Sequence, residues 1–253
     1  DPEKLIIQTD YDNDAKPARV SAQTLFNDSL AAFNKGEYAQ AETKLKEAAR
    51  ADADNALIRA WLARTLAAQK KNDEAATEAN AALKIVPAVG AASAWAHITL
   101  GQLALARGDA AEAARNLRRA IVETDEAPAQ YAAREALAQA EKAANLLQPV
   151  EESIRAWVAQ LDSLIKQPSS DRLYAIIVRE NLKQFVQGLT VTPPTAWATE
   201  ILRADKIDAN RVALDVALRV TADRRDLAGT AVFVLYRSGS GWMLEDVQLF
   251  NVK

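Results

Sequence analysis

Three related stretches of sequence decide the fold: AFNKGEYAQAETKLKEAARAD at 32–52, LAAQKKNDEAATEANAALKIVP at 66–87 and LALARGDAAEAARNLRRAIVETD at 103–125. With their shared small residues aligned, the repeating units begin at Ala22, Ala56 and Ala94, at spacings of 34 and 38 residues. A period near 34 residues with small residues at fixed positions predicts paired helices stacked into a solenoid. We therefore expect an all-α helical-hairpin solenoid in the first half of the chain.

Small residues within each unit explain how the hairpins stack. Two positions of every second helix are alanine: Ala41, Ala75 and Ala113 at the first, and Ala48, Ala82 and Ala120 at the second. Side chains this small let helix axes approach closely, so each hairpin can pack against the next. Gly36 and Gly108 suit the turns between helices, because glycine tolerates a left-handed conformation without steric cost. The middle unit has Lys70 where glycine is expected.

These features resemble the tetratricopeptide repeat family. The resemblance rests on the alanines above and on Leu62-Ala63, Leu100-Gly101, Gly36-Glu37-Tyr38, Gly108-Asp109 and Pro87. It implies an α–α superhelix over residues 22–148, in which a helix over Ala129–Leu147 caps the last repeat.

The second half of the chain has a different pattern. A helical stripe covers Val150–Ile165, and a second helix is expected over Leu173–Val186. After Pro193-Pro194 the period becomes two, which predicts an antiparallel meander. The strands are expected at 197–207, 212–220, 232–237 and 242–250, with a hairpin turn over Ser238–Gly241. Residues 149–253 are thus predicted to form an α+β domain.

The closing phrase Gly241-Trp242-Met243-Leu244-Glu245-Asp246-Val247, together with the order of elements, resembles the nuclear transport factor 2-like cone fold. In that family the sheet curves around an active site, a ligand site or a filled core. The resemblance therefore implies a cone without deciding what it does.

Composition excludes several classes of function. The net charge is −3 with acids and bases balanced in both halves, so nucleic-acid binding is not expected. The sequence has no cysteine, and no apolar run reaches the roughly 20 residues that a membrane span needs. Because the chain begins at Asp1, we expect a removed signal segment and a periplasmic or secreted bacterial protein, with a cytoplasmic one as the alternative. No cofactor or metal is expected.

The concave face of the repeats is the first candidate site. In the tetratricopeptide repeat family, certain positions of the first helix of each repeat face the concave surface. Some members of that family hold the terminal carboxylate of a peptide there with lysine and asparagine. This chain has a mainly apolar set instead, so that clamp is absent. The predicted partner-binding residues are Phe26, Leu30, Phe33, Arg64, Trp95 and Ile98.

An apolar concave face must be covered. The expected cover is another polypeptide, the chain's own Leu5-Ile6-Ile7 in the polar leader 1–21, or the C-terminal domain folding back.

The C-terminal domain offers a second candidate, a possible pocket at Tyr174, Tyr236 and Asp246. The simpler expectation is that Asp246 bonds a nearby amide or side chain and that Asp215 and Arg219 form an exposed pair on one strand face. His97, the only histidine, is expected to be packed rather than to bind a metal.

The sequence therefore favours a non-enzymatic interaction or scaffold protein. A ligand-binding or enzymatic cone located by the repeats is the alternative.

Overall fold

A computed structural model describes residues 20–85, 90–178, 182–239 and 241–253. The chain forms two compact units, Asp1–Ala129 and Gln130–Lys253. The predicted leader with Leu5-Ile6-Ile7, except its last two residues, lies outside the described residues. Among the described residues, no helix is long and apolar enough to cross a bilayer.

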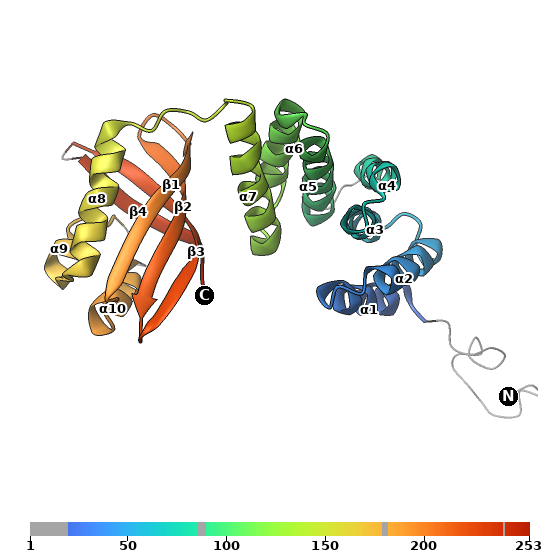
Figure 1. Cartoon of the computed structure of the whole chain (residues 1–253), viewed down its shortest axis with the longest axis horizontal. Coiled ribbons are helices and arrows are strands. Elements are labelled where there is room, and N and C mark those ends of the chain that lie inside the picture. Colours follow the sequence, from blue (N-terminus) through green and yellow to red (C-terminus); the bar gives the residue numbers. More distant parts are fainter. Residues whose placement is uncertain (1–19, 86–89, 179–181, 240) are drawn as a thin grey trace, which may run out of the picture. The chain divides into compact units, whose positions relative to one another are not determined.

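The described residues of the first unit form three helical hairpins, shown from blue to green in Figure 1. The helices are α1 (Ala22–Asn34) with α2 (Tyr38–Ala51), α3 (Ala56–Ala68) with α4 (Asn72–Lys84), and α5 (Gly90–Ala106) with α6 (Ala110–Glu123). The predicted repeat units are thus confirmed as helical hairpins. The side-chain oxygens of Ser21, Asn55 and Asp109 accept hydrogen bonds from free backbone N–H groups at the starts of α1, α3 and α6.

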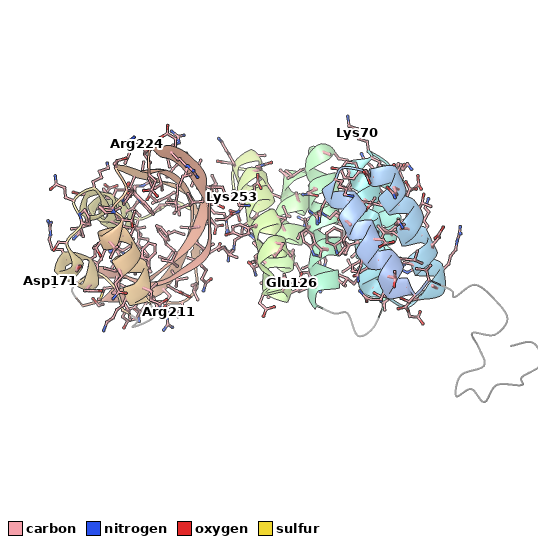
Figure 2. All side chains as sticks on the ribbon, turned by 90° about the horizontal axis from the view of Figure 1, so that it is seen from below. Lys70, Glu126, Asp171, Arg211, Arg224 and Lys253 are labelled. Carbon is pink, nitrogen blue, oxygen red and sulfur yellow. The ribbon has the colours of Figure 1, made fainter. Side chains whose placement is uncertain are left out.

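The repeated alanines occupy the positions that close packing requires. All six are at most 1% exposed. The turns also follow the pattern, because Gly36 and Gly108 have φ of 79° and 83°. Lys70 has φ 63° at the same place in the middle hairpin, a conformation that costs a side-chain-bearing residue about 1–2 kcal/mol. The Lys70 side chain points away from the helices (Figure 2), so it does not obstruct the turn. The backbone there adopts the same left-handed conformation as Gly36 and Gly108.

A nearly buried carboxylate ties the first hairpin to the second. Glu42 of α2 accepts hydrogen bonds from Lys46, Lys71 and Gln69 at 2.6, 2.7 and 2.8 Å. Burial acts to raise the pKa of Glu42, but these three donors outweigh it and lower the pKa from 4.5 to about 2. The ionised form therefore stabilises the folded chain.

The pH dependence of Glu42→Gln tests this contact. A carboxylate whose pKa is depressed by folding stabilises the fold above its unfolded pKa, and that contribution is lost as the pH falls toward about 2. We expect the wild type to be more stable than Glu42→Gln at pH 7, and the difference to shrink below pH about 4.5. Urea unfolding at pH 7, 5 and 3 measures it; a difference that is constant over this range would contradict the prediction.

The second unit contains most of α7 (Ala127–Ala143), then helices α8 to α10 and a four-stranded sheet. The helix predicted over Ala129–Leu147 is α7, which ends at Ala143. The compact units divide between Ala129 and Gln130, whereas the sequence prediction placed the boundary after Gln148, behind this helix. The remaining elements are α8 (Glu152–Lys166), α9 (Ser170–Tyr174), α10 (Lys183–Val191), β1 (Ala196–Lys206), β2 (Arg211–Ala222), β3 (Arg225–Ser238) and β4 (Gly241–Val252). The sheet is an antiparallel meander in the order β1-β2-β3-β4, as predicted.

Helices α8, α9 and α10 cover one face of the sheet, here called the inner face (Figure 1). Alternate residues of β2 and β3, including Leu214 and Phe233, pack there against Trp157 and Leu161 of α8. Phe233 and Leu214 are completely buried, so this face is filled by side chains of the unit itself.

The opposite, outer face carries charged residues because two strands change register. The pairing shifts between Ile201 and Arg203 on β1, which places Arg203 directly opposite Asp215 of β2. A second shift pairs Leu235 with Leu244 but Val234 with Asp246, so β4 carries one extra residue there.

Buried ion pairs join α7 to this outer face. The Arg203 guanidinium donates to Asp215 at 2.8 Å and to Glu141 of α7 at 2.9 Å, and it reaches Asp205 at 2.5 Å. Arg134 of α7 donates to the other oxygen of Asp215 at 2.7 Å. The expected exposed pair of Asp215 with Arg219 is therefore wrong, because Asp215 is only 6% exposed and both of its oxygens bind other arginines.

Candidate partner-binding surface

Four aromatic side chains from three helices form a continuous aromatic row in the first unit: Phe26 and Phe33 of α1, Trp61 of α3 and Trp95 of α5. The Trp61 ring is central, with ring centroids 6.4 Å from Phe26, 5.4 Å from Phe33 and 5.5 Å from Trp95. The first helices of consecutive hairpins thus contribute to one surface. The two phenylalanine rings meet Trp61 edge to face, an arrangement that stabilises aromatic pairs beyond the area they bury.

Arg64 lies on this row, one turn after Trp61 on α3. Its guanidinium carbon is 4.0 Å from the ring centroid of Trp95, 4.6 Å from that of Trp61 and 4.8 Å from that of Phe33. Cation–π contacts of this kind contribute about 0.5–2 kcal/mol each, the larger value applying where water is excluded. A single arginine therefore touches rings from all three hairpins.

The Arg64 charge is only partly compensated. Its guanidinium makes no ion pair or hydrogen bond to any residue in the described part of the chain. Burial lowers the pKa of Arg64 from 12.5 to about 10, and Tyr38 opposes this shift. The side chain stays protonated at neutral pH, and a cation held away from water favours a negatively charged partner.

The predicted contact residues fall into two groups. Phe26, Trp95 and Ile98 are 7%, 3% and 1% exposed, so they form the packed base of the surface. Leu30, Phe33 and Arg64 are half-buried and remain open to contact.

Trp61 was missed because the transferred family positions on α3 do not include it. A tryptophan one helical turn before Arg64 is the signal that points to it, since such a pair shares a helix face.

The residues of the predicted C-terminal pocket do not come together. Tyr174 packs on the inner core of the second unit, whereas Tyr236 lies near Arg211, whose guanidinium carbon is 5.8 Å from the ring centroid. Asp246 accepts hydrogen bonds from the Val247 N–H and the Gln248 amide, both at 2.9 Å, as the simpler expectation has it.

His97 is packed inside the third hairpin, as expected. It is 7% exposed and its Nδ1 lies 3.0 Å from the side-chain oxygen of Asn116. Within the described ranges, no cluster of histidine and acidic residues has the arrangement needed to hold a metal ion.

Comparisons with known proteins support the repeat architecture. The family model described as "Tetratricopeptide repeat" matches residues 29–89, from the middle of α1 to just before α5. No curated protein matches the chain.

Solved structures are also similar to about half of the chain. One is the first tetratricopeptide domain of Spaghetti (RPAP3) bound to the HSP90 peptide SRMEEVD, with 20% identity and a TM-score of 0.42 over 49% of this chain and 94% of that one. Another is the first such domain of human RPAP3, with the same identity, TM-score and share of this chain, and 92% of its own length. The matched residues 29–89 belong to the helical hairpins of the first unit, and repeats of this class suggest protein–protein interaction.

Proposed function

We propose that this chain is a non-enzymatic interaction or scaffold protein that holds another polypeptide on the surface around Arg64. The observation that carries the proposal is the Arg64 guanidinium, which stacks on three aromatic rings and has no acidic partner among the described residues. A buried or half-buried charge is normally paired. A partner that supplies a carboxylate completes this arrangement.

The neighbouring side chains define the rest of the partner. Leu30 and Phe33 are half-buried apolar residues one turn apart on α1, and the ring of Phe33 contacts the stacked arginine. We expect the bound segment to present an acidic side chain or a terminal carboxylate to Arg64 and an apolar side chain to Leu30 and Phe33.

Selection from a displayed library of random short peptides tests this function. With wild-type protein, we expect the retained peptides to be enriched in an acidic residue next to a large apolar one. Arg64→Gln is expected to lose this enrichment, because it removes the charge while keeping a polar side chain of similar length. Arg50→Gln on α2 is the matched control, since Arg50 is exposed on the second helix of its hairpin. Identical selections with wild type and Arg64→Gln would refute the proposed surface.

We further infer that residues 149–253 adopt a nuclear transport factor 2-like fold. The order of helices followed by a meander and the Gly241-Trp242 opening of β4 support this. Trp157, Phe185 and Trp242 pack on the inner face of the sheet, where the alternative of a ligand-binding or enzymatic cone would need space. This packing favours a filled core on that face.

A further inference from the structure

The second unit has a partly open cavity on the other face of its sheet. About 610 Å³ of space lies between α7 and the outer face, bounded by all four strands. This volume lies within the range of roughly 300–1,000 Å³ that small-molecule sites occupy. The ion pairs of Arg203 with Glu141 and of Arg134 with Asp215 hold α7 beside the sheet at the edge of this space.

The α7 side chains explain why the space is open. Arg134, Ala138 and Lys142 recur every four residues along the helix and all three line the cavity. The charged residues at the two ends of this stripe are long, but Ala138 between them is too small to reach the strands. A leucine or phenylalanine at this position would fill the gap that alanine leaves.

The β4 wall of the cavity has an unusual backbone. Gln248 pairs with Val232 and Asn251 with Thr230, so β4 has one more residue than β3 in this interval. Leu249 within it has φ 50°, a left-handed conformation that costs a leucine about 1–2 kcal/mol. Its carbonyl oxygen accepts a hydrogen bond from the Tyr131 hydroxyl of α7. Strained residues held by their surroundings are found preferentially at ligand sites and clamps.

The lining defines the chemistry of a ligand. Its apolar part includes Leu147, Leu202, Val232 and Leu249. Besides Tyr131, whose hydroxyl is bonded to Leu249, its uncharged polar side chains are Gln139, Thr230 and Asn251. In the part of the chain that the structure describes, the side chains of these three polar residues make no hydrogen bond, so they are available to a ligand.

The charges that line the cavity do not favour an ion. Arg134 and Asp215 are already paired with each other. The other charged residues of the lining are Glu135, Glu200 and Lys142, so negative and positive charges are both present. A charged ligand would gain little here, whereas an uncharged one can use the apolar walls and the neutral polar groups.

We propose that the cavity between α7 and the outer face of the sheet binds a small, uncharged, mainly apolar molecule that carries a hydrogen-bonding group. This site is separate from the Arg64 surface, and it does not depend on polypeptide binding there.

Titration with N-phenyl-1-naphthylamine, an uncharged apolar dye whose fluorescence rises away from water, tests the site. We expect saturable binding to the full-length wild type. Ala138→Phe places a ring in the middle of the cavity and should weaken dye binding at least tenfold. Ala143→Phe is the matched control, because Ala143 is exposed on the same helix and does not line the cavity. It should bind the dye as the wild type does.

A second variant keeps the test decisive if Ala138→Phe fails to fold. Thr230→Phe fills the same space from β3, where the Thr230 side chain is only partly buried. This variant should weaken dye binding to a similar degree. Arg64→Gln should leave dye binding unchanged, which separates this site from the polypeptide surface. Absence of saturable binding to the wild type, or wild-type affinity in a folded Ala138→Phe or Thr230→Phe variant, would overturn the proposal.

Discussion

Replacing Arg203 by methionine is expected to destabilise the second unit by about 3–5 kcal/mol at pH 7, since removal of one partner of a buried ion pair leaves charge without compensation. The Arg203 side chain is 2% exposed, and its partners Glu141 and Asp215 are 4% and 8% exposed. Burial opposes the charged form of Arg203, but its hydrogen bonds to Glu141 and Asp215 outweigh burial and raise its pKa. Methionine keeps the approximate length of the side chain, so lost volume contributes little.

Hydrogen exchange followed by mass spectrometry measures this effect within each unit. Peptides from β1, β2 and α7 should exchange faster in Arg203→Met, while those from α1 to α4 should not change. The double variant Arg203→Met with Glu141→Leu should recover part of the stability. A loss below about 1 kcal/mol would show that the ion pairs do not hold this face together.

Trp61→Ala is expected to have the second-largest effect, a loss of about 3 kcal/mol in the first unit. Truncation of a large aromatic side chain in packed surroundings typically costs about 3–5 kcal/mol, and the lower value suits a half-buried ring. Trp61 contacts Phe26, Phe33 and Trp95, so its removal leaves a gap at the centre of the aromatic row.

Trp242→Ala is the control for Trp61→Ala. Trp242 is also partly buried and also stacks against an arginine, Arg237, but it lies in the second unit. Exchange should accelerate in α1, α3 and α5 for Trp61→Ala, and only in the second unit for Trp242→Ala. Unchanged exchange in the three repeat helices of Trp61→Ala would mean that the row contributes nothing to holding the hairpins together.

The sequence was most informative where local pattern determines structure. The alanine and glycine positions of the repeats predicted the three hairpins, and the period-two segments predicted the meander. Both signals depend only on residues close in the chain. The predicted export of the protein and its unidentified partner remain predictions.

The outer face of the sheet shows what local pattern leaves undetermined. Asp215 was expected to pair with Arg219 on its own strand, but it binds Arg203, 12 residues away on β1, and Arg134, 81 residues away on α7. The register shift on β1 that puts Arg203 opposite Asp215 has no counterpart in the alternation of apolar residues. The cavity beside α7 depends on the same long-range arrangement, so local sequence pattern does not predict it.

The aromatic surface was partly predictable, because the repeat alignment determines which residues lie on the first helix of each hairpin. Phe26, Phe33, Arg64 and Trp95 were placed correctly on first helices by the repeat alignment, and the structure brings them together around Trp61. Which of them are buried depends on how tightly the alanine-rich hairpins pack, and that is a property of the assembled repeats.

The most direct test of the central claim is the affinity of one peptide from the wild-type selection, measured by isothermal titration calorimetry for wild type, Arg64→Lys and Arg64→Gln. We predict that Arg64→Gln binds on the order of tenfold to a hundredfold more weakly, which corresponds to a lost charge-assisted hydrogen bond. Arg64→Lys should be intermediate, because it keeps the charge but loses the planar group that stacks on the rings. Equal affinity of all three proteins, with their thermal stability unchanged, would contradict the account.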